Sequence, residues 1–171
     1  MITLITGGGR SGKSRYALEL AGKYGNRAFV ASAVAIDAEM RERIAKHRRE
    51  RGDAFFTAEA PLDPAAALRA LPHGTEVALL DCLTVWLGNL MHEGKLSDNL
   101  SCPEIEAFLE LLSSPPCDLI IVTNEVGMGI IPDNAMARIF RDLAGALNQR
   151  VAAKADRVIL MVSGVPVPVK G

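Results

Sequence analysis

The amino-acid sequence predicts a three-layer α/β domain built around a mostly parallel β-sheet. Two features support this fold class. Short apolar segments alternate along the chain with longer segments that have helical character. The apolar segments are continuous and do not alternate between apolar and polar residues, which is typical of parallel strands whose two faces are both covered by helices.

The first apolar segment leads into a glycine-rich loop. Residues 2–6 are short and apolar enough for a buried strand, and residues 15–21 favour a helix. Between them, residues 7–14 (GGGRSGKS), called the glycine loop below, match the pattern G-x-x-x-x-G-K-[ST]. A strand, this loop and a helix in that order are the context that a phosphate-binding loop requires, so a chance lysine in a glycine-rich turn is the weaker interpretation.

The residue types of the glycine loop suit the phosphates of a nucleotide. Glycines let the backbone bend until successive N–H groups point toward one anion, and a helix that starts near Gly12 adds the positive end of its dipole. Lys13 can reach the outer phosphates, and the Ser14 hydroxyl can bind magnesium. The predicted phosphate-contacting residues are Gly7, Gly8, Gly9, Arg10, Ser11, Gly12, Lys13 and Ser14.

The next part of the chain predicts two more strands with a basic helix between them. Residues 27–33 (RAFVASA) follow a Gly-Asn turn and form a second buried strand. Asp37 is a suitable N-cap for a helix that extends through residue 51 and ends at Gly52. Residues 54–58 predict a short strand.

The rest of the chain repeats the pattern of strand and helix, with proline and glycine residues between the segments. In chain order we expect a helix at 61–71, a strand at 76–80, a helix at 83–91, a polar loop at 94–99, a helix at 103–113 and a strand at 118–122. A loop at 126–134 precedes a long helix capped by Asp133 or Asn134, with an apolar stripe of Met136, Ile139, Phe140, Leu143, Leu147 and Val151. Residues 157–162 form the last clear strand, and residues 164–170, which contain prolines, form an edge strand or a tail.

Composition argues against several classes of function. The 19 basic and 20 acidic residues nearly balance, unlike the basic excess of proteins that bind nucleic acid or membrane surfaces. No apolar run is long enough to span a bilayer, and the chain begins directly with a strand rather than a signal segment. Cys82, Cys102 and Cys117 show no zinc or disulfide spacing. We therefore expect residues 1–171 to form a single cytoplasmic domain.

Polar residues at the carboxyl ends of strands are further candidates, because ligands of parallel sheets bind beyond those ends. Ser32, Asp81 and residues 123–125 follow predicted strands. Asp81 can hold magnesium through water, as the second nucleotide motif does, or it can cap the next helix. Asn124 and Glu125 can contact a second substrate or the metal, or they can form the turn.

The helix predicted over residues 37–51 carries six basic residues together with His47. A solvated basic face is the commoner reason for such a run, and a histidine beside Met40 and Ile44 is more often a core or boundary residue. The alternative is chemical, since imidazole can attack a phosphorus atom and nearby cations would neutralise the developing charge. On the last long helix, Arg138 and Arg141 either stabilise a transferring phosphoryl group or lie on the surface.

Several segments together are more specific than the glycine loop alone. They are residues 7–14, 37–51 (DAEMRERIAKHRRER), 57–59 (TAE), 79–90 (LLDCLTVWLGNL), 123–134 (TNEVGMGIIPDN) and 137–158 (ARIFRDLAGALNQRVAAKADRV). On these segments, over nearly its whole length, the sequence resembles the bifunctional adenosylcobinamide kinase / adenosylcobinamide-phosphate guanylyltransferase family of cobalamin biosynthesis. Members resemble RecA-type P-loop folds and can assemble as trimers, so the resemblance implies a RecA-like P-loop NTPase fold and a homo-oligomer.

The resemblance implies two reactions. A nucleoside triphosphate first phosphorylates the aminopropanol hydroxyl of adenosylcobinamide, and GMP from GTP is then transferred to that phosphate by way of a guanylylated histidine. The family's R-I-x-x-H segment matches residues 43–47, so His47 is the implied nucleophile beside the catalytic Lys13. GTP, ATP and Mg2+ are the implied cofactors, with Ser14 and Asp81 as metal ligands, and the choice between ATP and GTP as phosphate donor stays open.

The resemblance also implies nucleotide contacts after the second strand, just past the histidine, and at two later acidic residues. These are Ser32, Ala33, Arg48, Arg49, Glu50, Arg51, Glu59 and Asp81. The chain has Gly52 and Phe55 where the family often has proline and tryptophan. No motif marks a site for the corrinoid. A P-loop small-molecule kinase without guanylyl transfer is the alternative function, and a non-enzymatic nucleotide switch is a third.

Overall fold

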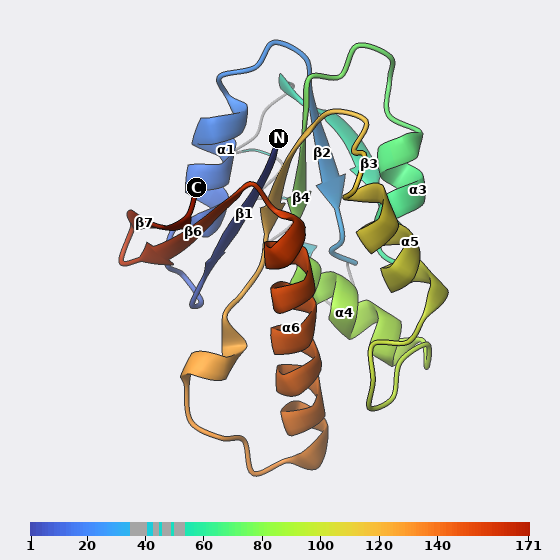
Figure 1. Cartoon of the computed structure of the whole chain (residues 1–171), viewed down its shortest axis with the longest axis vertical. Coiled ribbons are helices and arrows are strands. Elements are labelled where there is room, and N and C mark those ends of the chain that lie inside the picture. Colours follow the sequence, from blue (N-terminus) through green and yellow to red (C-terminus); the bar gives the residue numbers. More distant parts are fainter. Residues whose placement is uncertain (35–40, 43–44, 46–48, 50–53) are drawn as a thin grey trace.

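The computed structural model describes residues 1–34, 41, 42, 45, 49 and 54–171 of the chain. The described residues form one sheet of seven strands in the order β3-β2-β4-β5-β1-β6-β7 (Figure 1). The strands are β1 (Ile2–Gly7), β2 (Arg27–Ala31), β3 (Phe56–Glu59), β4 (Val77–Asp81), β5 (Asp118–Val122), β6 (Arg157–Val162) and β7 (Val165–Lys170). All neighbouring strands are parallel except β6 and β7, which confirms the predicted mostly parallel sheet.

Helices connect these strands. They are α1 (Lys13–Ala21), α3 (Pro64–Arg69), α4 (Leu83–His92), α5 (Pro103–Leu111) and α6 (Ala135–Lys154), with a short 3-10 helix η2 (Val126–Met128). The helix predicted over residues 37–51 lies largely outside the described residues, and the described ones within it (Arg41, Glu42, Ala45 and Arg49) are helical. None of the described helices combines the length and the apolar character needed to cross a membrane.

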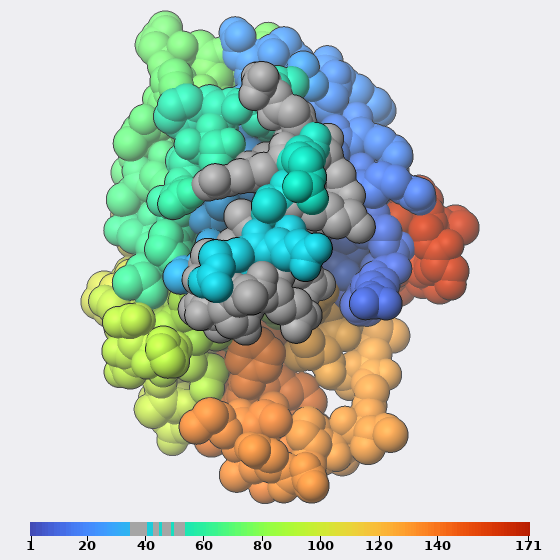
Figure 2. Space-filling view, turned by 180° about the vertical axis from the view of Figure 1, so that it is seen from behind, coloured from blue at the N-terminus to red at the C-terminus, as the bar shows by residue number. Residues whose placement is uncertain are grey.

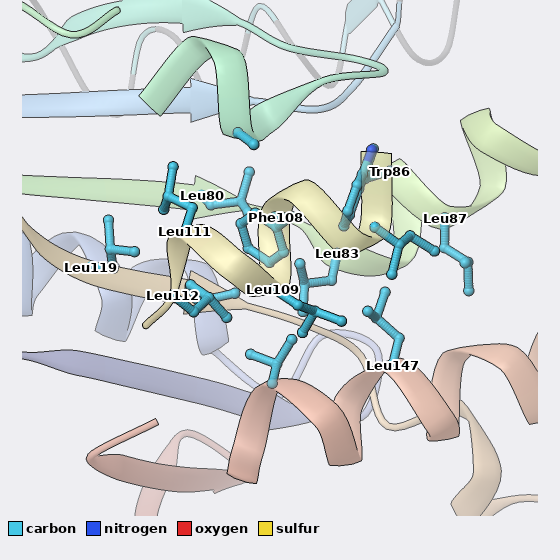
Figure 3. Close-up of a cluster of buried hydrophobic side chains, with 14 of the residues drawn as sticks. Leu80, Leu83, Trp86, Leu87, Phe108, Leu109, Leu111, Leu112, Leu119 and Leu147 are labelled. Carbon is cyan, nitrogen blue, oxygen red and sulfur yellow. The ribbon is translucent and has the colours of Figure 1, made fainter. Parts of the chain in front are cut away.

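Two separate hydrophobic cores lie on the two faces of the sheet. On one face, Ala17 and Ala21 of α1 pack in a cluster with Ile5 of β1. On the other face, α3, α4, α5 and α6 bury a larger cluster that is rich in leucine (Figure 3). Within it, the rings of Trp86 and Phe108 meet edge to face with their centroids 5.1 Å apart. This arrangement confirms the three-layer α/β fold.

Some boundaries differ from the prediction, and a local signal accounts for the start of α3. Helix α3 begins at Pro64 rather than at residue 61, because the Asp63 carboxylate accepts a hydrogen bond from the Ala66 N–H at 2.9 Å and caps the helix. Strand β3 spans residues 56–59 rather than 54–58. Residues 165–170 form an antiparallel edge strand beside β6, which was one of the two predicted alternatives.

The first turns of α6 extend beyond the carboxyl ends of the strands (Figure 1). Members of the predicted apolar stripe from Ile139 to Val151 are buried or partly buried. Met136, the first residue of the predicted stripe, differs from the others because it is 70% exposed. Within the described part of the chain, Met136 belongs to neither hydrophobic cluster, because the first turns of α6 lie beyond the sheet that the two clusters cover.

Candidate nucleotide-binding site

The glycine loop joins β1 to α1 at the carboxyl edge of the sheet. Gly7 and Gly12 have φ angles of +146° and +95°, which glycine adopts far more readily than other residues. A Cβ atom at Gly7 would lie 2.6 Å from the carbonyl oxygen of Met161 in β6. The Gly164 N–H donates a hydrogen bond to the Ser11 carbonyl at 2.9 Å. The loop is therefore held closely against β6 and the turn that follows it.

The middle of the glycine loop faces open space. Gly8 and Gly9 are exposed, and a Cβ atom at either would meet no other atom of the described residues within 4 Å. Arg10, at the tip, is exposed with a φ of +59°. Helix α1 starts at Lys13, within the last residues of the loop, and its N-cap residue is Gly12, which has no side chain to cap the first N–H groups. The N-terminus of α1 thus offers N–H donors and the positive end of its dipole to an anion in the loop.

We expect a Gly7→Ala variant to lose both stability and nucleotide binding. The added methyl group would overlap the Met161 carbonyl at a φ that disfavours alanine, with a combined cost of about 2–5 kcal/mol. Gly8→Ala is the matched control, because its methyl group would enter open space and should leave Tm unchanged. Thermal unfolding and nucleotide titration of both variants measure these effects, and equal Tm values for the two variants would contradict the prediction.

Lys13 lies inside the glycine loop and is only 6% exposed. Its Nζ atom donates a hydrogen bond to the Gly8 carbonyl at 2.5 Å and lies 3.4 Å from Ser11 Oγ. Burial lowers the pKa of Lys13, and the electrostatic effects of Cys82 and Asp81 oppose that shift. An ammonium group held at this point can meet the outer phosphates of a nucleotide bound in the loop.

Asp81 and Ser14 are the predicted magnesium ligands. Asp81 ends β4, which is separated from β1 and the glycine loop by β5 alone, at the same carboxyl edge of the sheet. Ser14 is half-buried in the first turn of α1. Within the described part of the chain, no three His, Cys, Asp or Glu side chains form a metal-binding cluster. A hydroxyl, a carboxylate and the phosphates of a nucleotide are the oxygen donors that Mg2+ prefers, so these two residues fit that ion.

Ser32, directly after β2, connects two elements through hydrogen bonds. Its buried hydroxyl donates to the Cys82 carbonyl at 2.9 Å and accepts from the Cys82 N–H at 2.8 Å. The Asn89 Nδ2 atom of α4 donates to the Ser32 carbonyl at 2.8 Å. The Ser32 hydroxyl therefore supports the junction between β4 and α4, and its contact with a nucleotide stays a prediction.

A second polar network secures the segment between β5 and α6 (residues 123–134), called the β5–α6 segment below. Thr123 Oγ1 donates to Asn148 Oδ1 at 2.7 Å, and Asn148 Nδ2 donates to the Asn124 carbonyl at 3.1 Å. Asn124 Nδ2 in turn donates to Thr84 Oγ1 at 2.8 Å. These bonds join the end of β5 to α4 and α6, so the start of the segment is fixed beside the carboxyl edge of the sheet.

Sequence reasoning did not assign a role to Asn148. The side chain is only 7% exposed and carries the network just described. Asn148 follows Ala144 by one helical turn and precedes Val151 by another, which places it on the buried face of α6. Helical spacing was therefore the signal that could have identified it.

Two of the remaining predicted residues, Ala33 and Glu59, lie at the same edge of the sheet. Ala33 follows β2 and is half-buried, and Glu59 ends β3 with an exposed side chain. Arg49 is exposed. The other residues predicted to take part in chemistry or nucleotide contact, which are His47, Arg48, Glu50 and Arg51, lie outside the described residues.

Arg138 and Arg141 make bonds within the start of α6. Arg138 Nη1 donates to the Pro132 and Asp133 carbonyls at 2.9 and 2.6 Å. Arg141 binds the neighbouring Asp142 carboxylate at 2.8 Å. These contacts favour the interpretation that both arginines are surface residues over the one in which they stabilise a transferring phosphoryl group.

The fold and the glycine loop define a P-loop nucleotide-binding protein. An ATPase from the type III secretion system of pathogenic bacteria has a similar structure, with a TM-score of 0.53 at 11% identity over 93% of this chain and 50% of that chain. A protein from Pyrococcus horikoshii matches with a TM-score of 0.55 at 6% identity over 99% of this chain and 86% of that chain. At such identities the likeness shows the fold alone.

Sequence comparison gives the particular family. The family model described as cobinamide kinase / cobinamide phosphate guanyltransferase matches residues 3–169. The bifunctional adenosylcobalamin biosynthesis protein CobP of Pseudomonas aeruginosa is 42% identical over 100% of this chain and 98% of its own length. The corresponding protein CobU of Escherichia coli is 36% identical over 99% of this chain and 100% of its own length. This chain therefore belongs to the cobinamide kinase / cobinamide phosphate guanyltransferase family and is an enzyme with the two activities of that family.

Proposed function

We propose that this chain carries out both family reactions at one phosphate site formed by the glycine loop. The first reaction transfers the terminal phosphoryl group of ATP or GTP to the hydroxyl of adenosylcobinamide, and the second transfers GMP from GTP to the resulting adenosylcobinamide phosphate. The observation that supports a shared site is the buried Lys13 ammonium, which the glycine loop holds through a hydrogen bond to the Gly8 carbonyl. Both reactions pass through an anionic phosphorus centre, so one anion site can serve each.

In the kinase reaction, the residues of the glycine loop position the nucleotide and neutralise its charge. The open backbone at Gly8 and Gly9 and the N-terminus of α1 bind the phosphates, and Lys13 meets the outer ones. Ser14 and Asp81 would hold Mg2+, which would supply positive charge to the oxygens of the transferring group. Such preorganised electrostatic stabilisation is typically the largest single contribution to this kind of catalysis.

The guanylyl transfer proceeds through His47 in this proposal. A ring nitrogen of His47 forms a bond to the α-phosphorus of GTP as the bond from that phosphorus to the bridging oxygen breaks and pyrophosphate leaves. An oxygen of adenosylcobinamide phosphate then attacks the same phosphorus and releases the imidazole. The match of residues 43–47 to the R-I-x-x-H segment supports this role. The further proposed nucleotide contacts are Ser32, Ala33, Arg48, Arg49, Glu50, Arg51 and Glu59.

Analysis of the products tests the proposed function. The enzyme is incubated with GTP, Mg2+ and adenosylcobinamide, and the corrinoid products are identified by mass. We expect adenosylcobinamide phosphate to form first and adenosylcobinamide-GDP to follow. Corrinoid phosphate alone, with no GMP bound to the protein under any condition, would support the kinase without guanylyl transfer instead. Parallel reactions with ATP determine which nucleotide donates the phosphate.

We also propose that the enzyme is a cytoplasmic homo-oligomer, and a trimer in particular. Exposed apolar side chains gather in and after the β5–α6 segment, where Met128, Ile130, Ile131 and Met136 are each at least 69% exposed. Soluble monomers rarely expose large apolar patches, so this surface suits a subunit contact. The free thiols of Cys82, Cys102 and Cys117 suit a reducing compartment.

Light scattering tests the oligomer. The wild type is expected to have the mass of a trimer, and an Ile130→Ser/Ile131→Ser double variant is expected to have a smaller mass at the same concentration. Both side chains are exposed, so the substitutions should leave the fold of one subunit intact. A wild-type mass equal to that of one chain would contradict the proposal.

A further inference from the structure

The kinase reaction needs a group that accepts the proton of the substrate hydroxyl, and no residue discussed so far has that role. Lys13 is a cation, and Ser14 and Asp81 are assigned to Mg2+. A carboxylate within reach of the attacking hydroxyl is a common proton acceptor in phosphoryl transfer. The order of strands in the sheet narrows the choice among the described residues.

Three described carboxylates lie at the carboxyl ends of strands: Glu59 at β3, Asp81 at β4 and Glu125 after β5. Strand β1, which carries the glycine loop, pairs with β5 and β6. With about 4.8 Å between neighbouring strands, β4 lies about 10 Å and β3 about 19 Å from β1. Strand β6 ends in Val162 and is followed by Ser163. Among the described residues, Glu125 is thus the carboxylate that follows a strand paired directly with β1.

Hydrogen bonds fix the backbone of Glu125 against the glycine loop. The Glu125 N–H donates to the Gly7 carbonyl at 3.0 Å. The preceding residue, Asn124, is held by Thr84 and Asn148 through bonds of 2.8 and 3.1 Å. Figures 1 and 2 show the residues after β5 (orange) and the glycine loop (blue) along the same edge of the molecule. Rotation about the side-chain bonds of Glu125 is then enough to aim its carboxylate at a substrate near the loop.

The Glu125 side chain is available for such a role. It is half-buried, and within the described part of the chain its carboxylate makes no hydrogen bond and no ion pair. Asp81 differs, because the proposed function assigns its carboxylate to Mg2+. A half-buried carboxylate that no other described residue engages can accept a proton from a neutral hydroxyl.

We infer that Glu125 is the general base of the kinase reaction, an inference that rests on the proposed function. Its carboxylate accepts the proton of the adenosylcobinamide hydroxyl as the hydroxyl oxygen forms a bond to the γ-phosphorus of the nucleotide. The bond from the γ-phosphorus to the β–γ bridging oxygen breaks, and the nucleoside diphosphate leaves with its electron pair. Glu125 then releases the proton to water. The guanylyl transfer needs no such base, because its acceptor is a phosphate oxygen that is already ionised.

A Glu125→Gln variant tests the inference, because it keeps the size of the side chain and the backbone bond to Gly7. We expect the kcat of corrinoid phosphorylation to fall about 10²–10⁴-fold, with the KM for nucleotide and the Tm unchanged. Transfer of GMP to prepared adenosylcobinamide phosphate should keep the wild-type rate. Asp133→Asn is the matched control, because it removes an exposed carboxylate at the far end of the same β5–α6 segment and should change neither rate.

Three results would overturn the inference. Unchanged phosphorylation by the Glu125→Gln variant would show that another group takes the proton. If Glu125→Gln slowed both reactions equally, Glu125 would instead bind the metal or stabilise the fold. If Asp133→Asn slowed phosphorylation as much as Glu125→Gln, the effect would come from the loss of any negative charge in this segment. A wild-type enzyme that forms no corrinoid phosphate contradicts the proposed function as well, whereas an active wild type with an equally active Glu125→Gln variant overturns this inference alone.

Discussion

Replacement of His47 by alanine is expected to abolish the covalent GMP adduct and to slow guanylyl transfer by about 10⁴-fold or more, while corrinoid phosphorylation stays near the wild-type rate. The two reactions differ in the group that attacks phosphorus. An imidazole nitrogen attacks the α-phosphorus of GTP in one reaction, and the substrate hydroxyl attacks the γ-phosphorus in the other. Loss of the imidazole therefore removes the covalent route of one reaction only.

GTP labelled in its α-phosphate provides the measurement. Denatured wild-type protein should retain an acid-labile label, and denatured His47→Ala protein should retain none. His73→Ala is the matched control, because His73 is exposed and lies between α3 and β4, at the edge of the sheet opposite the glycine loop. A His47→Ala variant labelled as strongly as the wild type would show that a different residue carries the GMP.

The parts of the structure that the sequence predicts well are those set by local chemistry. The glycine loop is one, since its backbone angles and the lack of room for a side chain require glycine. Gly7 has a φ of +146°, and a Cβ there would lie 2.6 Å from the Met161 carbonyl oxygen. The parallel strands are another, because burial on both faces requires continuous apolar segments such as residues 77–80 of β4 and 119–122 of β5.

The parts that the sequence does not predict depend on neighbours that are distant along the chain. Met136 fits the apolar stripe of α6 by spacing, yet the helix extends past the sheet there, and the length of that extension is set by other elements. Asn148 has a polar side chain of the kind usually found on the surface, yet it is buried. Glu125 lies beside the glycine loop because β5 pairs with β1 in the sheet, and no local sequence pattern predicts that pairing. The roles of His47 and residues 48–51 stay predictions, since the described residues there do not include the histidine.

A Lys13→Met variant is expected to slow both reactions by a similar factor of about 10²–10³ without lowering Tm. Lys13 is 6% exposed, and burial lowers its pKa, so the fold holds this ammonium in surroundings that disfavour its charge. Methionine has a similar length and no charge, and it should pack in the same space at least as well. The loss is then one of function, because a single ammonium meets the nucleotide phosphates in each reaction.

Initial rates of phosphorylation and of GMP transfer, measured together with Tm, decide whether the two reactions share one phosphate site. Lys23→Met is the matched control, because Lys23 is exposed just after α1 and its loss should change neither rate. A loss confined to phosphorylation would mean that GTP binds elsewhere during guanylyl transfer, and the shared site would be wrong. If Lys13→Met slows both reactions while His47→Ala slows only guanylyl transfer, the two reactions share one phosphate site. They then differ only in the group that attacks phosphorus.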